Sequence, residues 1–249
     1  MRAITPAPLP AAPVSQQKPS QPATVASSVY ERLRDDILTG GIEPGLKLRI
    51  DVICERYTAG NTPVREALSR LAAEGLVERH DQRGFTAAPL HLDELEALTR
   101  TRCDIDQLAL KDAMAHSSTQ WEEQIVLALH RLSRTPRSAQ DDAYVPNREW
   151  ERLHREFHRS LIANCRSRWL KQFSEELADQ AYRYRQCSIR NAYGVRDVHA
   201  EHVALAEAVL KGDVELAVTL LTQHYWRTAE FIQKAVGGMT AELRSSLLR

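Results

Sequence analysis

The chain has 249 residues, 43% of them hydrophobic, and its 33 basic and 33 acidic side chains give a formal net charge of zero. This length allows one large domain or two ordinary ones, the balanced charge gives no sign of a nucleic acid or membrane partner, and no apolar run approaches the roughly 20 residues that span a bilayer. The four cysteines lie far apart, which argues against a zinc ribbon or a disulfide framework and favours free thiols in a reducing cytoplasm.

The N-terminal part shows short elements separated by glycine and proline. Residues 1–26 hold six prolines among Ala, Ser and Gln, which predicts a disordered leader. Apolar spacing and break residues then predict a helix over 29–39, a strand over 46–50, helices over 51–57 and 64–75, and a two-stranded hairpin over 76–90. This order predicts a winged helix-turn-helix domain over 27–90, with the hairpin as the wing.

Longer helical patterns begin at Asp93 and continue to about Val236. Break signals divide them near 117–118, 135–136, 146, 164–167, 191–194, 212 and 237–238. We therefore expect six or so helices in an all-α bundle over 93–236, followed by a loose tail over 237–249. The expected fold class is mainly α, with an N-terminal winged helix-turn-helix and a C-terminal helical bundle.

Four histidines of the second part are candidates for a shared site. His154 and His158 differ by roughly 40° around a helix, on the side that also carries apolar residues, so both should point inward. His202 lies ten residues before Gly212 and His224 lies eleven after Asp213, so a turn there would bring both to the same height. Four converging imidazoles suit a divalent transition metal, whereas a lone inward histidine is usually a hydrogen-bonded core residue. His199, one turn before His202, is a spare candidate.

The stretch HREFH, residues 154–158, resembles the zinc-protease motif HExxH, but its glutamate is one place late. Glu156 should lie about 180° from the mean direction of the two histidines and cannot serve as the base on a metal-bound water. Di-iron bundles need two Glu-x-x-His motifs, and only Glu151 to His154 fits. Together with the lack of other catalytic motifs, this predicts that the chain is not an enzyme.

Arg102 lies on a helical seam that is otherwise apolar. A buried guanidinium needs an anionic partner. That partner is either Asp106, four residues on, or the carboxylate of a bound ligand held by two parallel hydrogen bonds.

The first part resembles the DNA-binding domain of GntR-family bacterial regulators, through VYERLRDDILTGGIEPGLKL and NTPVREALSRLAAEGLVERHDQRGF. The resemblance implies a double-stranded DNA operator, although a winged helix can also serve protein contact. A recognition helix presents its first turn to base edges, and a wing approaches the minor groove. We therefore expect DNA contacts from Arg49, Asn61, Thr62, Arg65, Arg83 and Gly84. Gly60 and Asn61 stand where the family usually has serine and arginine, so Asn61 either caps the helix or contacts adenine.

The second part resembles the FCD effector domain of FadR-type members, through LHREFHRSLIANC and EHVALAEAVLKGDVELAVTLLTQH. The resemblance implies a divalent metal, which we expect to be zinc, with nickel or another transition metal as the alternative. The matched ligands are His154, His158, His202 and His224, the first of which replaces the usual acid. Because FCD relatives bind small organic acids, Arg102 becomes the candidate partner of a small carboxylate effector.

These observations predict a cytoplasmic, homodimeric transcription regulator with no membrane partner. Bound at the metal and at Arg102, an organic acid would shift the DNA-binding domains and release the operator, which makes the protein a repressor. The alternatives are a metal-sensing regulator without an organic effector and, far less in keeping with Glu156, a helical-bundle metalloenzyme.

Overall fold

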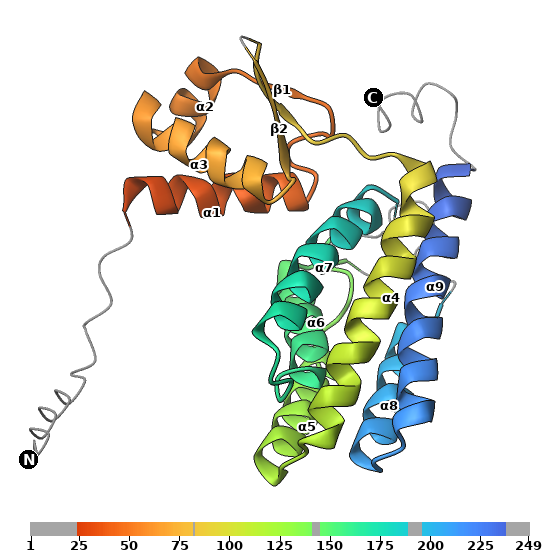
Figure 1. Ribbon diagram of the computed structural model, residues 1–249. Helices are drawn as coiled ribbons and strands as arrows, with labels where there is room; N and C mark the ends of the chain where they lie inside the picture. Colours follow the sequence, from red (N-terminus) through yellow and green to blue (C-terminus); the bar gives the residue numbers. More distant parts are fainter. Residues whose placement is uncertain (1–23, 82, 141–144, 189–195, 238–249) are drawn as a thin grey trace, which may run out of the picture.

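The computed structural model describes residues 24–81, 83–140, 145–188 and 196–237 (Figure 1). A small mixed unit of helices and strands sits beside one end of a longer helical bundle, and the chain passes from one to the other between residues 87 and 92. The expected fold class, a winged helix-turn-helix followed by an all-α bundle, is confirmed.

The N-terminal unit contains helices α1 (Val25–Leu38), α2 (Ile50–Tyr57) and α3 (Asn61–Ala73), and strands β1 (Lys47–Leu48), β2 (Val77–His80) and β3 (Gly84–Ala87). Helix α1 begins inside the segment 1–26 that was expected to be a leader, because the Thr24 hydroxyl accepts a hydrogen bond from the Ser27 amide and caps it. The rest of that segment, residues 1–23, lies outside the described residues.

The three strands form an antiparallel sheet in the order β1-β3-β2. Phe85 on the central strand pairs with Leu48 on one side and Arg79 on the other, and its ring is buried. The sheet closes a core in which Leu33, Leu68 and Leu71 have no exposed surface. Because α1 and α3 share this core, a displacement of α1 carries α3 with it.

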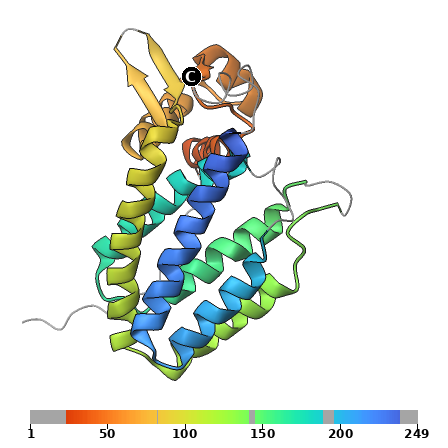
Figure 2. The same ribbon diagram turned by 90° about the vertical axis from the view of Figure 1, so that its right-hand side faces the viewer.

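The bundle contains α4 (Leu92–Ala115), α5 (Thr119–Ser133), α6 (Arg148–Leu161), α7 (Arg168–Ser188), α8 (Val198–Leu210) and α9 (Val214–Gly237). In Figure 2 α4 and α9 run side by side, and α5, α6 and α8 lie to their right. Helix α8 packs against α9 and α5, and α5 packs against α6. The core is centred on Trp121, Phe157 and Leu205, and the Trp121 indole donates a hydrogen bond of 2.7 Å to the Ser160 carbonyl. Among the described residues the bundle therefore has the six helices that were expected, whereas 191–194 and 238–249 lie outside them.

Helix α7 joins the two units. Near its middle Asp179 forms an ion pair with Arg34 of α1, and the Gln180 amide donates to the Gly75 carbonyl at 3.3 Å. Arg183 donates to the Ala88 carbonyl, and the Tyr184 hydroxyl donates to the His91 carbonyl at 2.9 Å. Side chains of α7 therefore hold the N-terminal unit, together with Arg148 of α6, which lies 3.3 Å from Asp35 of α1.

In the part of the chain that the structure describes, no helix combines the length and the apolar character needed to cross a bilayer.

Candidate functional site

Helix α6 supplies two of the four histidines. The Asn147 side chain caps its start by accepting from the Trp150 amide at 3.4 Å, and buried Phe157 anchors its inner face in the bundle core. His154 stacks on Trp150 with ring centroids 4.7 Å apart, and His158 lies one turn further along the same face. As predicted, Glu156 points away, toward Arg152 at 2.9 Å.

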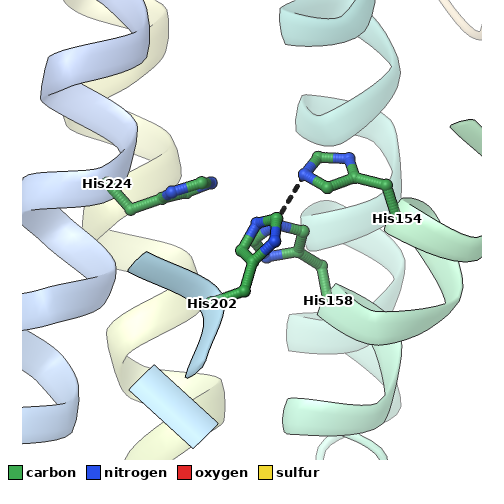
Figure 3. A group of neighbouring side chains, drawn as sticks. All are labelled: His154, His158, His202 and His224. Carbon is green, nitrogen blue, oxygen red and sulfur yellow. Dashed lines mark hydrogen bonds between the residues drawn. The ribbon is translucent and has the colours of Figure 1, made fainter. Parts of the chain in front are cut away.

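Helices α8 and α9 supply the other two histidines. Gly212 turns the chain between them with a φ of +73°, a conformation that glycine adopts without strain. The antiparallel packing of the two helices places His202 and His224 at the same height, with ring centroids 4.9 Å apart. Figure 3 shows the rings of all four histidines converging from three helices.

The four rings are close enough to share one ion. One ring nitrogen from each of His154, His158, His202 and His224 can be chosen so that all four lie within 4.8 Å of one another. The Nε2 atoms of His154 and His158 are 3.2 Å apart. Two nitrogens that bind one tetrahedral zinc at about 2.0–2.1 Å are about 3.3–3.4 Å apart. His199 does not join the group, because it is exposed and its Nδ1 lies 3.3 Å from the Ser133 hydroxyl.

The surroundings keep the imidazoles uncharged. Burial, reinforced by the neighbouring rings, holds the pKa values of His154, His158 and His202 well below their usual range. Burial also lowers the pKa of His224 to about 4, against the opposing pull of Glu201. Near neutral pH each ring therefore keeps a free lone pair, which is the form that binds metals.

The donor set fits a divalent transition metal. Among the described residues, His158 Nδ1 and His202 Nε2 are buried without a hydrogen-bond partner, and an unpaired buried polar atom costs free energy. A metal ion bound by His202 Nε2 would remove one of these costs. Neutral imidazoles suit zinc, copper, nickel and cobalt better than magnesium or calcium.

A second group of polar side chains contacts the Nδ1 atom of His224. This group was not predicted from the sequence. Glu201 Oε2 lies 2.8 Å from His224 Nδ1, and Arg196 binds the same carboxylate through two nitrogens. Burial alone would raise the pKa of the Glu201 carboxyl, but its bonds with Arg196 and His224 hold it far below its usual range. The one signal in the sequence is that Glu201 directly precedes His202, as an acid beside a candidate ligand.

A cavity of about 450 Å³ opens beside the cluster and is lined by His154, His158 and His224. Arg102, which was expected to bind an effector, also lines this cavity. Arg102 Nε lies 3.5 Å from Asp106 Oδ2, and its guanidinium covers the Tyr225 ring at 3.9 Å. The Tyr225 hydroxyl donates to Asp106 at 2.7 Å, whereas the buried Arg102 Nε has no hydrogen-bond partner among the described residues. Of the two partners considered for Arg102, Asp106 is therefore the one found beside it, although the two side chains are too far apart for a hydrogen bond.

The residues expected to contact DNA lie at the start of α2, at the start of α3 and on the wing. All are exposed: Arg49, Asn61, Thr62, Arg65, Arg83 and Gly84. Gly84 has a φ of +92° and no atom within 4 Å of the place a Cβ would take, so the wing backbone is open to close approach. Contact of these side chains with DNA stays a prediction.

Asn61 does not cap α3. Gly60 occupies the N-cap position and Asn61 is the first residue of the helix, where its Oδ1 accepts a weak hydrogen bond from Cys54 Sγ at 3.4 Å. Of the two roles considered for Asn61, helix capping is therefore not found. Arg49 is bonded to Asp51 at 2.8 Å, a pair that must open before Arg49 contacts a phosphate.

We expect the metal-free protein to lose stability when the pH falls from 7 to 5. The unfolded chain binds protons on its histidines near pH 6.5, whereas the folded cluster binds them only well below that, at about pH 4 for His224. In this window the unfolded state holds more protons, so the free energy of unfolding decreases as the pH decreases. Urea denaturation in EDTA at pH 7, 6 and 5 measures the effect.

His202→Leu should flatten this pH dependence, whereas His130→Gln, at an exposed position of α5, should leave it unchanged. Carboxyl groups ordinarily protonate below about pH 4.5 and contribute little above pH 5. A wild-type denaturation midpoint that stays constant between pH 7 and pH 5 would contradict the expectation.

Comparison with known proteins agrees with both parts of the chain. Residues 25–86 match the family model of bacterial regulatory proteins of the gntR family, and residues 96–227 match the FCD domain. The chain is 36% identical over 202 residues to the HTH-type transcriptional regulator BphR of Paraburkholderia xenovorans strain LB400, which covers 81% of this chain and 82% of BphR. It is 34% identical over 213 residues to the HTH-type transcriptional repressor GlaR of Escherichia coli K12, covering 84% and 96%.

Solved structures show the same fold at lower identity. Escherichia coli McbR/YncC superposes with a TM-score of 0.69 at 20% identity, covering 85% of this chain and 98% of that one. A GntR regulator from Rhodococcus sp. RHA1 gives a TM-score of 0.67 at 18% identity, covering 86% and 99%. The chain is therefore a transcription regulator rather than an enzyme, and it belongs to the GntR family with an FCD domain as its second part.

Proposed function

We propose that the protein is a cytoplasmic, homodimeric repressor that binds a divalent metal, most suitably zinc, at His154, His158, His202 and His224, and leaves its operator when a small carboxylate enters the adjoining cavity. The observation that carries the proposal is the convergence of four uncharged imidazoles, with ligand atoms within 4.8 Å, at the wall of a cavity that also contains Arg102. The name of GlaR, a repressor 34% identical to this chain, supports the direction of the response.

The cavity suits a small anion. Its volume of about 450 Å³ lies in the usual range for ligand sites, which is about 300–1,000 Å³. Arg102 is held near Asp106 at 3.5 Å, so a carboxylate that reaches its guanidinium would add hydrogen bonds that Asp106 leaves unmade. A metal bound by the histidines would add positive charge to the same cavity, so a small organic acid there would meet both the metal ion and Arg102.

The number of protein ligands favours a second candidate function. Four imidazoles complete the shell of a tetrahedral zinc ion, as in closed structural sites, and leave no position for a carboxylate. An effector that contacts the metal therefore requires an ion with a higher coordination number or the release of one histidine. His154, which stands where relatives usually have an acid, is the ligand that we expect to be released. If the ion neither takes a higher coordination number nor loses a histidine, the protein is a metal sensor without an organic effector.

The cavity reaches the DNA-binding unit. Besides the histidines, its walls include Glu31, Arg34 and Asp35 of α1. Asp179 of α7 forms ion pairs both with Arg34 and with Arg155, the residue that follows His154 on α6. A shift of α6 at the metal would thus move a charge that holds α1, which supports coupling between the two sites.

For the metal site, we expect purified wild-type protein to contain about one metal ion per chain, and His158→Ala and His224→Ala to contain much less. Each change removes one imidazole from the shell, and His130→Ala, at an exposed position, is the matched control. Elemental analysis after gel filtration gives the content. Undiminished metal in both variants would refute the site.

For the effector, we expect carboxylates to stabilise the protein only when metal is present. A thermal-shift screen of mono-, di- and tricarboxylates of two to six carbons, with zinc, with nickel and with EDTA, measures this. A true effector should also weaken binding to DNA that the protein has selected from a random pool, and Arg102→Met should reduce its affinity at least 10-fold. A panel without a stabilising acid, combined with DNA affinity that responds to metal alone, would support the metal sensor instead.

For the coupling, we expect Asp179→Asn to separate ligand binding from DNA release. The variant should bind an effector as the wild type does, because Asp179 lies at the domain junction, but the effector should change its DNA affinity by only about 2-fold, compared with the 5–150-fold typical of coupled sites. Glu176→Gln, at an exposed position of the same helix, is the control. Equal release by Asp179→Asn and the wild type would rule out this route.

A further inference from the structure

We infer that Glu201 determines which ring nitrogen of His224 carries the proton and so keeps the other nitrogen available to the metal. The inference rests on the proposed metal site and extends it to a positioning residue that contacts no ligand or metal itself. In Figure 3 the ring of His224 faces the other three histidines, and the inference concerns the contacts of its Nδ1 atom.

Two side chains with opposite requirements approach the same nitrogen. Glu201 Oε2 lies 2.8 Å from His224 Nδ1, and Arg196 Nη2 lies 3.1 Å from it. An ionised carboxylate can only accept a hydrogen bond, whereas a guanidinium can only donate one. Glu201 therefore requires a proton on Nδ1, and Arg196 requires a lone pair there.

Each requirement fixes the state of the other ring nitrogen. With the proton on Nδ1, the Nε2 lone pair is free and can bind a metal ion. With Arg196 donating to Nδ1, the proton of the neutral ring moves to Nε2 and blocks coordination. Metal-binding histidines usually donate their second N–H to a carboxylate or a carbonyl, and loss of that partner typically weakens metal binding 10–100-fold.

Arg196 is held beside His224 by bonds that do not involve Glu201. Its Nη1 donates to the Thr228 hydroxyl at 2.7 Å and its Nη2 to the His224 carbonyl at 2.9 Å. Removing the carboxylate would therefore leave the guanidinium in place as a donor. Arg227 lies 3.5 Å from the other Glu201 oxygen, so Glu201 stands between two arginines and the histidine.

Glu201 also supplies negative charge that the ligands lack. The four proposed ligands are neutral imidazoles and include no carboxylate. The carboxylate of Glu201 is mostly buried, so its charge is weakly screened at the cluster. Its place on α8 next to His202 means that one short segment supplies both a ligand and the positioning residue of another ligand.

The test measures the protonation pattern of His224 and zinc affinity separately. Protein labelled with ¹⁵N-histidine is examined by NMR in EDTA at pH 7.5, and the His224 signals are assigned from their loss in His224→Gln. Zinc Kd values come from competition with a coloured chelator. The variants are Glu201→Ala, which removes the acceptor, Glu201→Gln, which keeps a neutral acceptor, and the double variant Glu201→Ala with Arg196→Met. The control is Glu207→Ala, which alters an exposed glutamate of α8 that pairs with Lys211.

We expect the proton to lie on Nδ1 in the wild type and on Nε2 in Glu201→Ala, with zinc binding 10–100-fold weaker in that variant. Glu201→Gln should be intermediate, and removing Arg196 as well should restore most of the affinity. Circular dichroism shows which variants fold. If Glu201→Ala does not fold, the comparison of Glu201→Gln and the double variant with the wild type decides the inference.

Two results would overturn the inference. The first is a proton that stays on Nδ1 in Glu201→Ala, because Glu201 would then influence the site through its charge alone. The second is a zinc Kd of Glu201→Ala that lies within 2-fold of the wild-type value. A wild-type protein that binds no zinc would instead refute the proposed metal site, while the NMR measurement in EDTA would still decide the role of Glu201.

Discussion

The arrangement of the bundle core depends on keeping four imidazoles uncharged in one small space. Their ligand atoms lie within 4.8 Å of one another, a separation at which protonated rings would repel strongly. Three arginines approach the cluster, and each is balanced by one acid, in the pairs Arg102–Asp106, Arg185–Glu151 and Arg196–Glu201. Because every nearby cation has its own counter-charge, the cluster adds almost no net charge to the core when it is empty. An ion that enters it therefore brings positive charge, which an incoming anion can help to offset.

Helix α7 is the structural link between this core and the DNA-binding unit. Through Arg185 it bonds to Glu151 of α6, and two and six residues earlier Arg183 and Asp179 hold the N-terminal unit. The same helix thus forms a wall of the cavity and the support for α1. A rigid helix that contacts both sites can transmit a small displacement without rearrangement of the core between them, since packed interiors resist compression.

Much of the fold and the four histidines followed from local pattern. The spacing of His154 and His158 indicates that they share one helix face. The similar numbers of residues that separate His202 and His224 from the turn at Gly212 indicate that they lie at the same height in a helical hairpin. The roles of Glu201 and Arg196 could not be predicted in this way, because they arise where side chains of α8, α9 and the segment before α8 meet. Asn61 shows another limit, since proline in the first turn predicted the helix but not which residue would stand at its N-cap.

The turn at Gly212 and Asp213 imposes a strict length on the chain around it. One residue more or less would rotate α9 by about 100° relative to α8 and shift it by about 1.5 Å. His224 would then leave the cluster, and its contacts with Glu201 and Arg196 would be lost in the same step. Insertions and deletions are usually tolerated in surface turns. In this protein such a change in an exposed turn, far from the cavity, would remove His224, a proposed metal ligand, together with the contacts that position it.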